Sequence, residues 1–200
     1  MNIKDQFGND VDIQHLEKDE QDLVEKYIQE DDIVLELGAR YGSVSCIINS
    51  KLNKKTNQLV VEPDQRVWDA LEINKHTNQC EFFILKGFLS CKKLDLTNLE
   101  DYHGGYGATF IENGETMIPS FSLQEVKKKY HLEFNVLVAD CEGFLETFFD
   151  ENPDFYSGLR MIIFEEDYPE KCNYDKIRNT LTQQGFSCLE SGHQNVWTRG

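Results

Sequence analysis

Short apolar runs recur along the chain, and segments with the spacing of amphipathic helices separate them. The runs lack a regular alternation of apolar and polar positions. This pattern is typical of parallel strands that helices cover on both faces. We therefore expect an α/β domain with a mostly parallel sheet, whose strands lie at residues 33–35, 59–61, 82–85, 136–139 and 161–164.

The segments around these runs predict the helices. Residues 1–30 form an N-terminal helical segment, because apolar residues between Leu16 and Ile28 follow helical spacing. Two apolar stretches, 186–189 and 196–198, flank a turn at Ser191 and Gly192, which predicts a C-terminal antiparallel hairpin and a sheet of seven strands. The remaining helices are expected at residues 43–52, 64–75, 123–130, 143–149 and 174–184.

Residues 88–120 fit neither period and are rich in glycine and aromatic residues, above all between Tyr102 and Gly107. Long irregular insertions on a compact scaffold often bind ligands. We expect this insertion, within a single domain spanning residues 1–200, to close over a bound substrate.

The composition restricts the partners more than the fold. The 200 residues fit one domain with its own core. Acidic residues number 36 and basic residues 20, which gives a formal net charge of −16. We expect such a chain to avoid nucleic acids and anionic membrane surfaces. No apolar run approaches the roughly 18 residues of a membrane span, so no membrane insertion is expected.

The six cysteines are widely spaced and form no CxxC pair, which fits neither a zinc site nor a disulfide scaffold. The first residues lack the basic and apolar regions of a signal peptide. We therefore expect free thiols and a cytoplasmic location, which for a viral protein would be the host cytoplasm.

Four of the five predicted strands end in an acidic residue: Glu36, Glu62, Asp140 and Glu165. The carboxyl ends of parallel strands meet at one edge of a sheet, where ligands bind. Four carboxylates gathered there would repel one another unless ligands, metals or solvent relieve the repulsion. This edge is therefore the predicted functional site.

The first strand runs into a glycine turn of the form Glu-x-Gly-x-x-x-Gly, with Gly38 and Gly42 as its glycines. Gly38 permits a tight turn close to a ligand, and Gly42 lets the next helix start nearby. Arg40 stands where a dinucleotide-binding pattern requires glycine, so a pyrophosphate ligand is not expected. The spacing suits a nucleoside that carries methionine, held by Glu36, Gly38, Arg40 and Gly42.

Glu62 ends the second strand, where a carboxylate can accept hydrogen bonds from both ribose hydroxyls. Together with the glycine turn, it predicts a binding site for S-adenosylmethionine. A surface carboxylate at a strand end is the simpler alternative for Glu62.

A longer motif makes the chain resemble the FkbM family of class I methyltransferases. Residues 140–146 resemble the family's Asp-x-Glu-Gly-x-Glu signature, with one extra residue before the last glutamate. Residues 118–123 and 162–165, and the closing pattern from Tyr174 to Phe186, are also similar to that family. The resemblance covers roughly residues 33–190.

The resemblance implies a Rossmann-like fold and O-methylation of a sugar hydroxyl in a glycan. The chain also resembles the methyltransferase modules of chlorovirus proteins that build capsid glycans. That likeness implies rhamnose as the acceptor sugar, and a chain that is one domain of a larger glycan-synthesis protein.

A sugar hydroxyl is a weak nucleophile and needs a base or a metal ion at the point of attack. Asp140, Glu142 and Glu165 end neighbouring strands and are candidate oxygen ligands for Mg²⁺ or Mn²⁺. Alternatively, Asp140 is the base, with Glu142 as its partner or only as a helix cap. His103, in the insertion, is a further candidate for the catalytic base.

Two other functions remain open from the sequence. The chain could methylate a protein or another small molecule, or it could bind the donor without activity. Binding of the donor and turnover with a sugar acceptor separate these possibilities.

Overall fold

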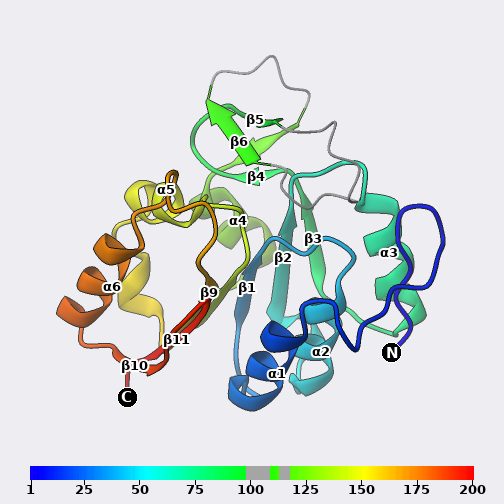
Figure 1. Ribbon diagram of the computed structural model, residues 1–200, viewed down its shortest axis with the longest axis horizontal. Coiled ribbons are helices and arrows are strands. Elements are labelled where there is room, and N and C mark those ends of the chain that lie inside the picture. The colour runs from blue at the N-terminus through cyan, green and yellow to red at the C-terminus, as the bar shows by residue number, and fades with distance from the viewer. Residues whose placement is uncertain (98–108, 113–117) are drawn as a thin grey trace.

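The computed structural model describes residues 1–97, 109–112 and 118–200, and its centre is a seven-stranded sheet (Figure 1). The spatial order of the strands is β10-β11-β9-β8-β1-β2-β3. Neighbouring strands are parallel except at β11, which is antiparallel to both β9 and β10. The strands are β1 (Val34–Leu37), β2 (Gln58–Glu62), β3 (Phe83–Lys86), β8 (Val136–Ala139), β9 (Met161–Glu165), β10 (Ser187–Glu190) and β11 (Gln194–Thr198).

Three helices cover each face of this sheet (Figure 1). One face carries α1 (Lys18–Tyr27), α2 (Ser43–Lys51) and α3 (Trp68–Thr77), and the other carries α4 (Leu123–Tyr130), α5 (Leu145–Glu151) and α6 (Tyr174–Gln183). Short 3₁₀ helices lie at Lys55–Asn57 and Phe155–Gly158. None of the helices in the described ranges is long and apolar enough to cross a membrane.

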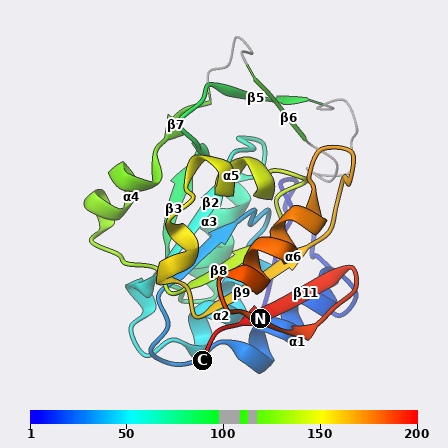
Figure 2. The same ribbon diagram turned by 90° about the vertical axis from the view of Figure 1, so that its left-hand side faces the viewer.

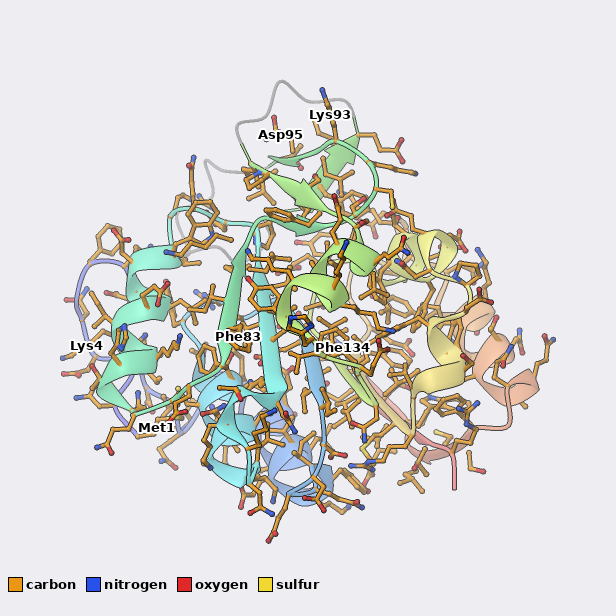
Figure 3. All side chains as sticks on the ribbon, turned by 180° about the vertical axis from the view of Figure 1, so that it is seen from behind. Met1, Lys4, Phe83, Lys93, Asp95 and Phe134 are labelled. Atoms are coloured by element: carbon orange, nitrogen blue, oxygen red, sulfur yellow. The ribbon has the colours of Figure 1, made fainter. Side chains whose placement is uncertain are left out.

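The pleat of the strands divides the core between the two faces. In β1, Val34 packs with residues of α1 and α2, whereas Leu35 packs with residues of α4, α5 and α6. Successive side chains of a strand point to opposite faces, so a strand covered on both sides is apolar at nearly every position. Figure 3 shows Phe83 and Phe134 in the middle of the molecule, where the ring of Phe83 packs against Tyr130 of α4, with 4.8 Å between the ring centres and a tilt of 38°.

Above the carboxyl ends of β1, β2 and β3, the insertion forms two small sheets (Figures 1 and 2). β4 (Phe88–Leu89) pairs with β7 (Ser120–Phe121), and β5 (Leu94–Thr97) pairs with β6 (Thr109–Glu112). Lys93 and Asp95 mark this layer in Figure 3. The prediction of an irregular segment over 88–120 is therefore wrong for its described parts.

The predicted α/β architecture, with a mostly parallel seven-stranded sheet and a C-terminal antiparallel hairpin, is confirmed. Three helix starts are wrong, among them that of α3, which begins at Trp68 instead of residue 64. The first helix begins at Lys18, after a turn-rich segment, and α5 begins at Leu145 instead of residue 143. Glu142 and Gly143 have φ angles of 53° and 83°, which no α-helix accommodates, so the chain makes a tight turn before α5.

Candidate functional site

A pocket opens at the carboxyl edge of the sheet, where the ends of β1, β2 and β8 meet the insertion. It encloses about 900 Å³, the open space at its mouth included. Two sides meet in it: Glu62 ends β2 and Asp140 follows β8, with the Gly38 turn of β1 between them. The insertion supplies apolar walls through Phe88, Leu89, Leu96 and Phe110. The pocket thus lies at the edge of the sheet where the acidic residues at the strand ends predicted a ligand site.

Gly38 joins the two sides of the pocket through the backbone. Its φ angle is +83°, and a Cβ atom built on it would lie 1.7 Å from the carbonyl oxygen of Asp140. The turn is further held by hydrogen bonds from Gly38 N to Val61 O (3.0 Å) and from Asp140 N to Leu37 O (3.0 Å). Bulk at Gly38 would therefore strike the protein backbone, and not only the space of a ligand.

Glu62 organises the glycine turn. Its Oε2 accepts hydrogen bonds from the backbone N–H groups of Ala39 (3.1 Å) and Arg40 (2.7 Å), and its Oε1 accepts one from Asp64 (2.7 Å). An ionised carboxylate has about four lone-pair sites, so little capacity remains for ribose hydroxyls while these bonds persist. Burial raises the pKa of Glu62 to about 7 against these hydrogen bonds.

Glu36 lies inside the protein, and it also contributes to the pocket floor. Its side chain is 1% exposed and accepts hydrogen bonds from Ser45 Oγ of α2 (2.6 Å) and Gln58 Nε2 of β2 (2.8 Å). Burial raises the pKa of this carboxyl to about 8, and repulsion from Glu17 and Glu62 adds to the rise. The residue thus connects the pocket to the packing of α2.

Glu36→Gln is expected to remove part of the loss of stability that occurs as the pH rises from 4.5 to about 8. A carboxyl whose pKa rises on folding from 4.5 to about 8 stays protonated in the folded state while the unfolded state ionises. Its contribution is therefore complete below pH 4.5 and is lost as the pH rises to about 8. Since each pKa unit corresponds to about 1.4 kcal/mol, the loss amounts to a few kcal/mol.

Urea unfolding of the wild type and the variant between pH 4 and 9 measures this difference. The free energy of unfolding of Glu36→Gln should fall less steeply with pH than that of the wild type. The exposed Glu30→Gln should follow the wild type. Parallel curves for all three proteins would show that Glu36 ionises equally easily in both states.

The other two residues of the glycine turn lie at different distances from the pocket. Arg40 lines it, has a φ angle of 47°, and places its guanidinium 4.7 Å from the centre of the Tyr41 ring. Gly42 is not among the lining residues, and a Cβ atom there would lie 2.7 Å from Leu71 Cδ1 of α3. Gly42 therefore serves the packing of α2 against α3, and we do not place it against a ligand.

Asp140 directly follows β8 and lies on the opposite side of the pocket from Glu62. Burial and the charges of Glu165, Glu142 and Glu17 raise its pKa well above the ordinary value for aspartate. Carboxyls with raised pKa values are common where a protein needs a base that works near neutral pH.

Glu142 lines the pocket beside Asp140, in the turn before α5. The N-cap of α5 is Phe144, and no side chain caps this helix. The interpretation of Glu142 as a helix cap is therefore wrong. His103, the other candidate base, lies outside the described residues, as do Tyr102 and Tyr106 of the insertion.

The predicted metal ligands Asp140, Glu142 and Glu165 are not the group that lies at ligand distances. In the described ranges, the metal-ligating atoms that gather within 4.8 Å of one another belong to Glu165, Asp167 and His193. Asp140 and Glu142 line the pocket itself, whereas Glu165 turns toward β11. The sequence analysis missed Asp167, which lies two residues after Glu165, and His193, which only the pairing of β11 with β9 brings to Glu165.

Glu17 and Glu20 also escaped the sequence analysis. Glu17 lines the pocket and accepts a hydrogen bond from Ser43 at the start of α2, and burial raises its pKa. Glu20, in the first turn of α1, is 5% exposed. A signal that could have identified them is a pair of acidic residues at the start of a helix that packs against the predicted acidic edge of the sheet.

No protein-family model and no curated protein matches the sequence. Solved structures share its fold. The chain aligns with precorrin 8w decarboxylase of Methanobacterium thermoautotrophicum at a TM-score of 0.57 and 11% identity, over 92% of this chain and 90% of that one. An O-methyltransferase from Bacillus cereus in complex with SAH aligns at 0.57 and 12%, over 90% of this chain and 78% of that one.

A putative tRNA (m1A22) methyltransferase of Streptococcus pneumoniae, in complex with S-adenosyl-L-methionine, aligns at a TM-score of 0.53 and 13% identity. The match covers 92% of this chain and 73% of that chain. Identities this low show a common fold and leave the substrate open. The chain has the Rossmann-like fold of class I methyltransferases.

Proposed function

We propose that the protein is an S-adenosylmethionine-dependent O-methyltransferase that acts on a sugar hydroxyl. The observation that carries the proposal is the pocket lined by the Gly38 turn, Glu62 and Asp140, which offers a donor side and a carboxylate base within one cavity. Two of the aligned structures hold S-adenosylmethionine or SAH, which supports the same donor for this fold.

The donor would lie across the ends of β1 and β2. The Gly38 turn would border the methionine part, and Glu62 and Asp64 would provide carboxylates for the ribose hydroxyls. The ribose would displace at least one of the backbone N–H groups that Glu62 now accepts, since a carboxylate cannot accept all of these bonds at once. The turn would therefore adjust when the donor binds.

In the transfer, the acceptor oxygen forms a bond to the methyl carbon while the bond from this carbon to sulfur breaks. The electron pair of that bond goes to the sulfonium sulfur, and Asp140 takes the proton of the hydroxyl. The apolar walls of the insertion would exclude water, which competes with the hydroxyl. The carboxylates around Asp140 also suit the positive charge of the donor.

The sugar acceptor rests on the FkbM resemblance of residues 140–146 and on the likeness to chlorovirus glycan-building modules. The same resemblances suggest a glycan as the partner, or a larger glycan-synthesis protein of which this chain is one domain. Two of the aligned proteins are named as a putative tRNA methyltransferase and a putative RNA methyltransferase. The net charge of −16 argues against a nucleic acid as the acceptor here.

Glu62→Gln is expected to weaken the binding of S-adenosylhomocysteine by about 10-fold or more, since a charged hydrogen-bond acceptor is worth roughly 1.5–3 kcal/mol. The amide nitrogen of the glutamine would also face backbone N–H groups of the glycine turn, so that a donor would oppose a donor. Isothermal titration calorimetry measures the affinity, and thermal unfolding shows whether the fold survives.

The exposed Glu81→Gln serves as the control and should bind as the wild type does. Unchanged affinity in a folded Glu62→Gln protein would contradict the donor site. Transfer of a labelled methyl group to a rhamnoside, but not to RNA or a protein, would support the sugar acceptor. Donor binding without transfer to any of these would instead favour a binding module.

A further inference from the structure

A second group of polar side chains lies beside Asp140 but outside the lining of the pocket. Glu165 ends β9, Asp167 follows it, and His193 lies in the turn that leads into β11. The antiparallel register pairs Gln194 with Glu165, which places His193 next to that carboxylate. Strand pairing therefore adds His193 to two carboxylates that are already close in the sequence.

We propose that Glu165, Asp167 and His193 form a binding site for a divalent cation. Binding of the cation does not depend on the proposed methyl transfer, whereas any role of the cation in the reaction rests on the proposed function. Two carboxylate oxygens and one imidazole nitrogen are ligands that a first-row divalent metal ion accepts.

The separations between the ligand atoms fit one ion. His193 Nε2 lies 2.9 Å from Glu165 Oε1 and 3.9 Å from Asp167 Oδ1. In an octahedral site with bonds of about 2.1 Å, adjacent ligands lie about 3.0 Å apart and opposite ligands about 4.2 Å apart. The first distance therefore matches two adjacent ligands, and the second lies between an adjacent and an opposite pair.

Two unpartnered polar groups point to a missing positive charge. Gln194 donates from Nε2 to Glu165, and its Oε1 is fully buried with no hydrogen-bond partner. Glu20 is 5% exposed and makes no hydrogen bond or ion pair with the chain as far as the structure describes it. Its carboxyl lies near enough to Asp140 and Glu165 for their charges to raise its pKa. A buried carbonyl oxygen without a partner is costly, and the carboxyl of Glu20 adds negative charge near Glu165 that a cation there would offset.

The backbone already holds the candidate ligands in place. The Tyr174 hydroxyl accepts a hydrogen bond from Asp167 N (3.0 Å) and donates one to Asp167 O (2.7 Å). Glu166 N donates to His193 O (2.8 Å), which ties the turn of β11 to the end of β9. Glu166 itself pairs with Arg178 and Asn195 and is not a candidate ligand. Such outer contacts orient metal ligands and reduce the cost of binding.

Titration of the purified chain with MnCl₂ in the absence of donor tests the site. We expect one saturable Mn²⁺ per chain, bound more tightly than Mg²⁺ or Ca²⁺, because the imidazole suits transition metals better. Asp167→Asn and His193→Ala should each raise the Kd for Mn²⁺ by about 10-fold or more. Mn²⁺ should raise the melting temperature of the wild type and leave that of the variants nearly unchanged.

His15→Ala is the matched control, since His15 pairs with Asp12 at 2.8 Å but has no further carboxylate in its group. It should bind Mn²⁺ as the wild type does. Unsaturable binding, or equal affinity in the control and in both site variants, would overturn the cation site. Binding of S-adenosylhomocysteine, measured in the same variants, reports separately on the proposed function, and its absence in a protein that binds Mn²⁺ would contradict only that function.

Discussion

Gly38→Ala should destabilise the protein by about 3 kcal/mol or more, because the new methyl group meets two separate costs. The φ angle of +83° lies in the left-handed region that L side chains adopt only with strain. The added Cβ would also lie 1.7 Å from the carbonyl oxygen of Asp140. That oxygen is part of the backbone, so β1 and β8 must move apart at the edge that carries the site.

Gly8→Ala separates the two costs. Gly8 has the same φ angle of +83°, but a Cβ atom there meets nothing within 4 Å. The Gly8→Ala variant should lose only about 1 kcal/mol of its free energy of unfolding, through backbone strain. Urea unfolding of both variants measures the difference, and equal losses would mean that the contact with Asp140 is relieved without cost. Loss of donor binding in a Gly38 variant would accordingly not report on donor contacts alone.

Asp140→Asn should lower kcat by roughly 10²–10⁴-fold, the usual contribution of a catalytic base. The amide keeps the size of the side chain but cannot take up the proton of the acceptor hydroxyl. It also removes one charge from the group formed with Glu165, Glu142 and Glu17, so the folded protein should be as stable as the wild type or more so. Methyl transfer to a rhamnoside, with the affinity for S-adenosylhomocysteine measured alongside, tests both expectations.

Glu146→Gln is a fitting comparison, since Glu146 lies in the first turn of α5, is not among the pocket-lining residues, and pairs with Lys176 at 2.9 Å. Its kcat should stay within about threefold of the wild type. If Asp140→Asn kept a wild-type kcat, the base would have to be another group, and the proton transfer proposed here would fail.

The local sequence predicted most of the sheet and its helices. Runs such as residues 136–139 are apolar at every position because both faces of β8 are covered, and this holds whatever the neighbouring strands are. The turn at Glu142 and Gly143 was not predicted, since two successive left-handed residues interrupt a segment whose composition suits a helix. The small sheet of β5 and β6 was also not predicted, because residues 98–108 separate its two strands in the sequence.

For the site, the sequence by itself determined that Glu62, Asp140 and Glu165 come at strand ends, because the end of an apolar run is a local property. Only the tertiary structure decided what these carboxylates contact. Glu62 accepts backbone N–H groups of the turn after β1, and Glu165 meets His193 through the register of an antiparallel strand. Such contacts depend on which strands pair and which helix starts pack above them. Those choices arise from burying the whole core at once, and no window of local sequence contains them.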